Sequence, residues 1–485
     1  MIVLVNPWST HSSKKPLPMS LLAIAAVLEG EFEYTIVDGN IVGDPVACIE
    51  AVASERRLTA IAITVMPGPQ LVRAVPMARD LKHRFPGVPI IWGGYFPSEH
   101  PEVVLRDGAA DYCVRGQGER SLVALMRVLV NGGALDEIPG LCYVENGTIR
   151  SNPLAPLVAL DELPLWPYER LEMRHYFHRH YLGNRVGAHH SSYGCPHACS
   201  FCAVVGIANR RWVAQSPERV ERVLRQFTSV YGADAVQFHD MDFFISEPRT
   251  AAIAERIARL GLTWWALGRV DELMRYKSAT WTLMKRSGLK MVFCGAESAS
   301  NDTLRHMNKG GTSAAGQTLE LAARMREFDV VPEFSFVVGN PPDPEADLRQ
   351  TLEFIRKIKS INEAAEIILY VYSPVRGDGS LENNSFSFPQ TLDQWIDERW
   401  QSFALRRDPR TPWAPHTIRQ RVRNFETVLN AYYPTVTDMR LTPARRKVLR
   451  MMAAWRYHGR VESTPFELNA MQRVFHYQRP ETTGF

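Results

Sequence analysis

The sequence lacks the features that mark membrane, secreted and nucleic-acid-binding proteins. No apolar run reaches the roughly 18 residues that a membrane span requires, and the apolar stretch at residues 1–7 has neither the basic flank nor the cleavage site of a signal peptide. The net charge is only +4 over 485 residues, which is too small to indicate a nucleic-acid partner. We therefore expect a cytoplasmic protein with no membrane or nucleic-acid partner.

The chain has few cysteines, and most of them are not spaced as in a disulfide framework. Of the seven cysteines, four are scattered along the chain, as expected for reduced thiols in a core. These four are Cys48, Cys113, Cys142 and Cys294. The other three, Cys195, Cys199 and Cys202, stand in C-x3-C-x2-C spacing. This usage excludes a disulfide-rich secreted scaffold and points to a metal-binding loop.

Residues 194–202 read Gly-Cys-Pro-His-Ala-Cys-Ser-Phe-Cys. Thiolates at this separation suit a [4Fe-4S] cluster held by one loop, and three ligands leave one iron open to chelate a small molecule. The alternative is a tetrahedral zinc site, which needs a fourth Cys or His. His197 is available for that role, but no second C-x2-C pair exists to complete a zinc ribbon. The spacing therefore favours the cluster.

Residues 1–150 alternate between short apolar strands and amphipathic helices. Strict alternation of this kind predicts a doubly wound parallel sheet with helices on both faces, the α/β class. The expected strands are Ile2–Val5, Tyr34–Val37, Ala60–Val65, Pro89–Trp92 and Tyr112–Val114. A sheet of this kind predicts one binding edge for the whole domain.

Ligands of open parallel sheets bind at the carboxyl ends of the strands. Small or polar residues stand there in this chain, and glycine lets a bulky ligand approach the backbone closely. The candidates are Asn6, Gly68, Gly93, Gly94, Gly116, Gly118 and Glu119. Taken singly each is also what any flavodoxin-like domain carries in these turns.

Residues 151–187 are rich in proline and predict an extended linker that runs over the surface. From residue 188 to about 380, six further strand–helix units follow. Their expected strands are His189–Ser192, Ala235–Phe238, Thr263–Leu267, Met291–Gly295, Glu333–Val338 and Ile367–Tyr372. Six parallel units are too few for a closed eight-stranded barrel, so we expect a partial (β/α)6 barrel with its active site at the carboxyl ends of the strands.

Acidic, basic and hydroxyl side chains follow the expected barrel strands. They are Asp240, Asp242, Arg269, Glu297, Ser298, Asn340, Tyr372 and Ser373. Any one of them is explained by helix capping or by a solvated loop, but their gathering at one rim indicates an active site. Beyond Gly379 the alternation ends. We expect residues 381–485 to form a small helical cap over the barrel mouth, with four tryptophans in amphipathic patterns. These are Trp395, Trp400, Trp413 and Trp455.

The cysteine loop resembles the signature of the radical S-adenosylmethionine (SAM) superfamily. The resemblance implies that the open iron binds the amine and carboxylate of SAM and that reductive cleavage yields a 5'-deoxyadenosyl radical. It also implies that Phe201 lies beside the adenine. The run Gly-Ala-Glu-Ser-Ala-Ser at residues 295–300, with the lysine that follows it, resembles a second superfamily segment. By that resemblance Glu297 contacts the ribose hydroxyls and Lys309 the SAM carboxylate. Further candidates for the same pocket are Asp240, Arg269, Ser298 and Ser335.

The runs at residues 93–98 and 115–122 resemble the cobalamin-binding domain that precedes the radical SAM domain in one subfamily, which includes class B methyltransferases and bacteriochlorophyll-cyclase-like enzymes. The connector at residues 160–167 resembles the same subfamily. In methionine-synthase-type domains, an Asp-x-His-x-x-Gly motif supplies a histidine ligand to the lower face of cobalt. That motif is absent here, because Asp38-Gly39-Asn40-Ile41 contains no histidine. The resemblance therefore implies cobalamin bound without a histidine ligand. A domain that kept the fold and lost the cofactor is the alternative.

These resemblances imply a cobalamin-dependent radical SAM methyltransferase that acts on an unactivated carbon of a small natural product, such as an antibiotic. An electron donor such as flavodoxin or ferredoxin would be its partner. The rival enzyme does not methylate and is a diol dehydratase of an aminoglycoside or a ring-forming cyclase. In that case Glu297, Cys294 or Tyr372 would exchange a proton with the substrate. The non-enzymatic rival is a cobalamin or iron–sulfur sensor, against which the polar barrel rim argues.

Overall fold

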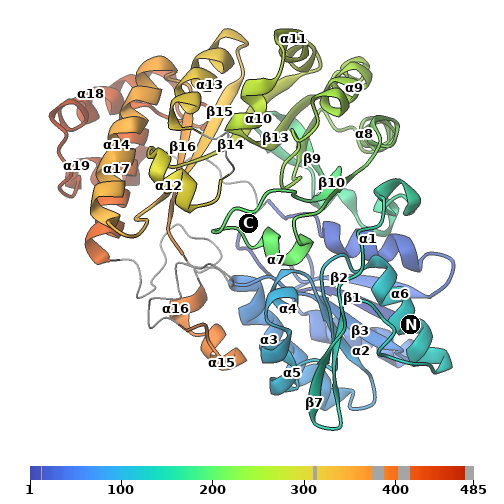
Figure 1. The fold of residues 1–485 in the computed structure, drawn as a ribbon. Helices are drawn as coiled ribbons and strands as arrows, with labels where there is room; N and C mark the ends of the chain where they lie inside the picture. Colours follow the sequence, from blue (N-terminus) through green and yellow to red (C-terminus); the bar gives the residue numbers. More distant parts are fainter. Residues whose placement is uncertain (13, 310–313, 374–386, 402–414, 476–485) are drawn as a thin grey trace.

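The computed structural model describes residues 1–12, 14–309, 314–373, 387–401 and 415–475 (Figure 1). Within these residues two seven-stranded sheets and one two-stranded sheet are formed. The first large sheet lies in the N-terminal part of the chain and the second in the middle, with the helices packed around them (Figure 1). No helix of the described residues is long and apolar enough to cross a membrane.

The first sheet has the strand order β2-β1-β3-β4-β5-β6-β7. Its strands are β1 Ile2–Asn6, β2 Tyr34–Asp38, β3 Ala60–Thr64, β4 Ile90–Gly93, β5 Tyr112–Val114, β6 Leu141–Glu145 and β7 Thr148–Ser151. The first five are parallel, as expected, because buried apolar runs joined by helices pair in that way. The antiparallel hairpin β6–β7 was not predicted. The order 2-1-3-4-5 has its switch point between β1 and β3, where ligands of this sheet type bind.

Helices cover both faces of this sheet, as the alternation predicts. They are α1 Met19–Leu28, α2 Pro45–Glu55, α3 Pro69–Arg84, α4 Tyr95–Glu99, α5 Pro101–Asp107 and α6 Glu119–Asn131. One apolar cluster packs between the sheet and α3 and α5, and a second packs on the other face against α1 and α6. The short helices α4 and α5 were missed, because a sharp glycine start and an early proline leave no long periodic stripe.

The second large sheet has the order β16-β15-β14-β13-β12-β9-β8. Its strands are β8 His178–His180, β9 Gly183–His189, β12 Ala235–Phe238, β13 Thr263–Arg269, β14 Leu289–Glu297, β15 Val331–Val338 and β16 Glu366–Val371. Six of them are parallel, which confirms the partial barrel. The first barrel strand was predicted too late. It is β9 rather than His189–Ser192, because residues 192–194 belong to β10 Ser192–Gly194, which pairs with β11 Trp212–Ala214.

The barrel helices lie outside the sheet (Figure 1). They are α8 Pro217–Tyr231, α9 Glu247–Ile257, α10 Val270–Arg275, α11 Ser278–Arg286, α12 Asn301–His306, α13 Ala315–Glu327 and α14 Pro344–Ile361. Their apolar faces and the outward side chains of the strands form one buried cluster. The short helices α10 and α12 were not predicted, and each follows a barrel strand at the rim.

The segment between the two sheets does not simply run over the surface. Tyr168, Tyr176 and Phe177 are buried in the barrel cluster, and the Tyr168 hydroxyl lies 3.0 Å from His189 Nδ1. The Tyr176 hydroxyl donates to Asp38 Oδ2 at 2.8 Å, which ties the segment to the first sheet. The proline content predicted an extended chain correctly but concealed these aromatic anchors.

The described helices of the C-terminal region pack at two places, neither of them the expected cap over the barrel mouth. The helices α15 Leu392–Trp395 and α16 Glu398–Gln401 bring Trp395 and Trp400 into the apolar cluster of the first sheet. The remaining helices, α17 His416–Tyr432, α18 Pro443–Gly459 and α19 Phe466–Phe475, lie at the outer side of the barrel beside α14 (Figure 1). Trp455 is exposed, and Trp413 lies outside the described residues. An amphipathic pattern shows that a face is covered but not by what, and the described helices cover other surfaces than the expected one.

Candidate active site

The loop that carries the three cysteines runs from β10 to α7 Val204–Ala208, over the carboxyl ends of the barrel strands. Two hydrogen bonds attach it to the segment after α12. The Ser200 N–H donates to the Met307 carbonyl at 2.9 Å, and Asn308 Nδ2 donates to the Ala198 carbonyl at 2.9 Å. None of the three forms a disulfide with a described residue, and Cys199 is buried. The loop is therefore held from several sides while its sulfur atoms stay available as ligands.

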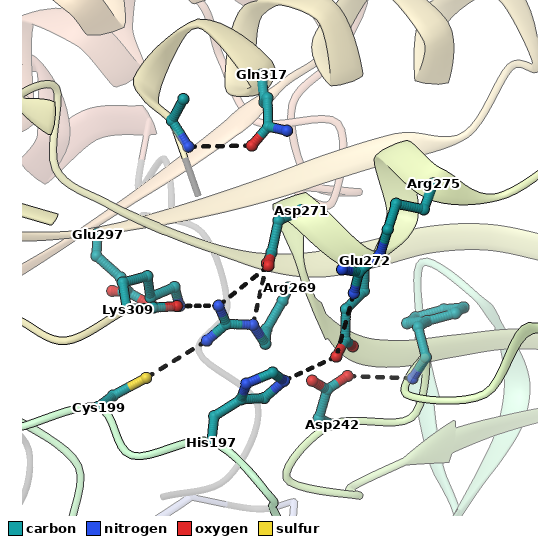
Figure 2. Close-up of polar contacts among 12 residues, drawn as sticks. His197, Cys199, Asp242, Arg269, Asp271, Glu272, Arg275, Glu297, Lys309 and Gln317 are labelled. Carbon is teal, nitrogen blue, oxygen red and sulfur yellow. Dashed lines mark hydrogen bonds and ion pairs between the residues drawn. The ribbon is translucent and has the colours of Figure 1, made fainter. Parts of the chain in front are cut away.

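Arg269, at the end of β13, reaches this loop directly. Its guanidinium donates to Cys199 Sγ at 3.4 Å and to the Lys309 carbonyl, and it forms a two-point ion pair with Asp271 at 3.0 and 3.2 Å (Figure 2). Burial alone would lower the pKa of Arg269, but the Asp271 carboxylate outweighs it and raises that pKa. The side chain is thus a fixed positive group on one cysteine sulfur.

Glu297 and Lys309 form a buried ion pair, with Lys309 Nζ donating to Glu297 Oε1 at 2.9 Å (Figure 2). A register shift in β14 between Gly295 and Glu297 and a φ of 64° at Glu297 turn this carboxylate back over the strand. A Cβ at Gly295 would lie 2.3 Å from Glu297 Oε1. A side chain at this position would therefore displace the Glu297 carboxylate and disturb its pair with Lys309. Burial opposes the charge on Lys309, but Glu297 outweighs burial and raises the pKa of Lys309.

Three other predicted residues lie at the same rim. Lys309 Nζ is 5.8 Å from the centroid of the Phe201 ring, which connects the aromatic residue of the cysteine loop to the ion pair. Ser335 on β15 is buried and pairs in register with Gly295. Tyr372 follows β16, where its N–H donates to the Val338 carbonyl at 2.9 Å, and its side chain is partly exposed.

Other predicted residues are not brought to this group. Cys294 faces the helices inside the barrel's apolar cluster, and burial raises the pKa of its thiol, so its proposed proton exchange with substrate is not supported. Asp240 is buried and accepts hydrogen bonds from the Ser191 and Ser192 hydroxyls, which occupies it with the strand before the cysteine loop. Ser298 is buried and accepts from the Ser300 N–H at 3.1 Å, which is a turn role.

The carboxyl edge of the first sheet faces the helix that follows the cysteine loop. Gly116 lies beside α7, because a Cβ there would be 3.3 Å from the Ile207 carbonyl, and α4 packs on α7. Gly68 and Gly94 have φ values of 89° and 96° and begin α3 and α4. Gly93 has open space, since the nearest atom to an added Cβ is the Val114 carbonyl oxygen at 3.9 Å. Of these glycines, Gly93 is the one beside which the structure shows room for a ligand.

Asn6 has a different role from the one predicted. Its side-chain Nδ2 donates to Asp38 Oδ1 at 2.8 Å, and its side-chain Oδ1 accepts from Gln70 Nε2 at 2.7 Å. Asn6 therefore organises the switch point between β1 and β3. Gly118 precedes α6, whose first residue is Glu119, and burial raises the pKa of Glu119.

Sequence reasoning missed the acidic residues at the start of α10. Asp271 holds Arg269, and Glu272 Oε1 lies 2.7 Å from His197 Nε2 in the cysteine loop (Figure 2). Asp242 stands next to this pair. A polar Arg-Val-Asp-Glu run directly after a barrel strand is the sequence signal that would have located them, although not their partners.

The side chains gathered at the rim match the chemistry of the two groups that the sequence implies, an iron–sulfur cluster and SAM. Three cysteine thiols on one loop beside a guanidinium suit an iron–sulfur cluster. A buried carboxylate and ammonium at the same rim suit the hydroxyls and carboxylate of SAM. Fold and site together define a two-domain enzyme of radical chemistry, in which a flavodoxin-like domain adjoins a partial barrel with a three-cysteine loop.

Comparison with known proteins agrees with this class. The family model of the B12 binding domain matches residues 11–126, and that of the radical SAM superfamily matches residues 190–355. The chain therefore carries a B12 binding domain followed by a radical SAM domain.

Two sequence relatives and one solved structure show the breadth of this family. An uncharacterized methyltransferase of Pyrococcus horikoshii, PH0819, is 29% identical over 74% of this chain and 78% of its own length. The anaerobic magnesium-protoporphyrin IX monomethyl ester cyclase of Synechocystis is 23% identical over 53% of each chain, so this chain spans about half of it. The cobalamin-dependent SAM radical enzyme OxsB, solved with aqua-cobalamin and SAM bound, has a TM-score of 0.67 at 16% identity over 98% of this chain and 75% of its own.

The Glu297–Lys309 pair leads to a prediction about SAM. Replacing Glu297 by glutamine or Lys309 by methionine is expected to weaken SAM binding by about 1–3 kcal/mol, or roughly 5- to 150-fold in Kd, because each change leaves a buried charged partner unpaired. Equilibrium dialysis with labelled SAM measures it. A matched control is Lys285→Met, which removes an exposed lysine–aspartate pair far from the rim. Unchanged affinity in both variants would show that the SAM pocket lies elsewhere.

Proposed function

We propose that this protein is a cobalamin-dependent radical SAM methyltransferase that methylates an unactivated carbon of a small molecule. The single observation that carries the proposal is the placement of the three-cysteine loop between the barrel rim and the carboxyl edge of the cobalamin-binding domain. When bound, the cluster with SAM supplies the 5'-deoxyadenosyl radical and cobalamin supplies the methyl group. A one-electron donor of the flavodoxin or ferredoxin type would serve as the partner, which places the protein in the cytoplasm.

The residues of the chain have three tasks in this proposal. Cys195, Cys199 and Cys202 ligate the cluster, and Arg269 holds Cys199 in place. Glu297 and Lys309 would hold SAM by its ribose hydroxyls and its carboxylate. Phe201 would lie beside the adenine. Each task is binding or orientation, and orientation of the reacting atoms contributes much of the rate of such reactions.

The contact between α4 and α7 supports a methylating enzyme. Because α7 begins two residues after Cys202, the edge of the first sheet that would hold the corrin lies next to the cluster loop. A methyl donor has to stand close to the carbon radical, and this contact keeps the two sites adjacent. A ring-forming cyclase is the second candidate, favoured by the similarity to the Synechocystis cyclase.

Product mass tests the proposal. With SAM carrying a deuterated methyl group, cobalamin and a chemical reductant, the methylated product is expected to be heavier by one labelled methyl group per turnover. Because the substrate is unidentified, an extract of cells that lack the gene for this enzyme serves as the substrate mixture. Heat-inactivated enzyme is the control. A product formed with 5'-deoxyadenosine but without the label would instead favour cyclisation or dehydration.

A further inference from the structure

One group of buried side chains beside the cysteine loop has no role in the scheme above. His197, between the first two cysteines, donates or accepts at 2.7 Å with Glu272 Oε1 on α10. Asp242, which follows β12, lies so close that the ligand atoms of all three residues fall within 4.8 Å of one another. Figure 2 shows the histidine reaching up from the cysteine loop to the two acids.

The two acids are almost inaccessible, with Asp242 1% and Glu272 4% exposed. Asp242 Oδ1 accepts from the Phe244 N–H at 3.1 Å. Within the described residues, Asp242 Oδ2 and Glu272 Oε2 have no hydrogen-bond donor. A buried carboxylate oxygen without a donor is strongly disfavoured, so this pair needs one more positive charge.

The charge of Arg269 acts to lower the pKa of both acids, but neither orphan oxygen receives a hydrogen bond from a neighbouring cation of the described chain. Arg269 is committed to Asp271 and to the cysteine loop. Arg275 stands 3.9 Å from Glu272 Oε1 and is 58% exposed, so solvent screens it. The cysteine thiolates would add negative charge beside the group. Two adjacent carboxyl groups in these surroundings cannot both be ionised, and one proton satisfies both orphan oxygens at once.

We propose that Asp242 and Glu272 share one proton and together act as a clasp that holds His197, and through it the loop of the three cysteines. The proton resides on Asp242, whose O–H donates to Glu272, and Glu272 accepts from His197. The clasp joins the middle of the C-x3-C segment to the ends of two barrel strands. These residues are positioning residues.

Electrostatics agree with this assignment of the proton. Burial, and next the charge of Glu272, raise the pKa of Asp242 well above its usual range. For Glu272, burial is outweighed by hydrogen bonds from His197 and Asp242, which lower its pKa. A bound cation is a poorer explanation, because 2.7 Å between His197 and Glu272 is a direct hydrogen bond. Two ligands of one zinc-sized ion lie about 3 Å or more apart.

The experiment compares three variants with the full-length wild type. Asp242→Asn keeps a donor toward Glu272, whereas Asp242→Ala removes that donor and Glu272→Ala removes its acceptor. Asp234→Ala is the control, because Asp234 accepts two backbone N–H groups near the start of β9, far from the cysteine loop. Infrared spectra in H2O and D2O report the C=O stretch of a protonated carboxyl group. Release of iron from the reconstituted protein to a chelator reports how firmly the loop holds its cluster.

The wild type is expected to show a D2O-sensitive carboxyl band that Asp242→Asn lacks. Asp242→Asn should release iron at nearly the wild-type rate, and the two alanine variants about tenfold or more faster, in line with the effect of partners behind metal ligands. An infrared band that is unchanged in Asp242→Asn would overturn the clasp. So would iron release from the alanine variants that is no faster than from Asp234→Ala. Stoichiometric Mn²⁺ binding that is lost in Asp242→Ala would overturn it as well. If an alanine variant does not fold, the infrared band of the wild type and its loss in Asp242→Asn still test the shared proton.

This inference rests on the cluster ligation in the proposed function, but the two fail separately. Wild-type protein that takes up no cluster would contradict the proposed function and leave the infrared band as the test of the shared proton. Wild-type protein with a cluster but without the band would contradict only the clasp.

Discussion

Replacing Cys195, Cys199 or Cys202 by alanine is expected to abolish the [4Fe-4S] cluster and, with it, all cleavage of SAM to 5'-deoxyadenosine. Each thiolate would ligate a different iron, and a two-cysteine loop cannot hold the cluster against loss to solvent. The fold should survive, because the loop sits at the rim and the barrel cluster does not depend on it. Anaerobic reconstitution followed by iron and sulfide analysis, the visible spectrum and 5'-deoxyadenosine assay measures the effect.

Cys48→Ala provides the matched control, since Cys48 is a partly buried cysteine on α2, remote from the loop. It should reconstitute like the wild type. Reconstituted wild-type protein that contains one zinc and shows no four-iron spectrum would contradict the cluster assignment. The zinc alternative would then need a fourth ligand, and His197→Ala would identify it.

Cobalamin is expected to bind to the first domain, and withholding it should abolish methyl transfer while SAM cleavage persists. The bound cofactor should show a spectrum without a nitrogenous axial ligand from the protein, because Asp38-Gly39-Asn40-Ile41 after β2 contains no histidine. Protein purified from cobalamin-supplied cells and its visible spectrum give the measurement. A nitrogen-ligated spectrum would contradict it, and His11→Ala would then be made, since His11 lies in the loop after β1.

A single substitution can test where the corrin lies. Gly93→Leu should leave the sheet intact, because an added Cβ meets only the Val114 carbonyl oxygen at 3.9 Å, yet it would fill the open space at the end of β4. We expect bound cobalamin to fall below detection. Gly43→Leu adds the same side chain at another open position, in the loop before α2, and should bind normally. Normal cobalamin binding by Gly93→Leu would show that the corrin does not lie at this edge.

The sequence by itself determined the parts of this protein that depend on short-range patterns. The spacing of Cys195, Cys199 and Cys202 is local chemistry, and it predicted the metal loop without any structure. The alternation of apolar strands and helices predicted both parallel sheets, because an apolar run of five residues and a stripe of period 3.6 each define one element. Glu297 and Lys309 were located by the resemblance of residues 295–300, and of the lysine that follows them, to a superfamily segment.

Only the tertiary structure decided which distant residues meet. Arg269 and Cys199 are 70 residues apart, and His197 and Glu272 are 75 apart, so no local pattern joins them. The direction of a side chain was equally beyond the sequence: Cys294 and Glu297 belong to one strand, yet the first faces the helices and the second the rim. The C-terminal tryptophans show the same limit, because an apolar face requires burial but any apolar surface can provide it. Contacts between elements depend on how the whole chain packs, and that is a property of the fold.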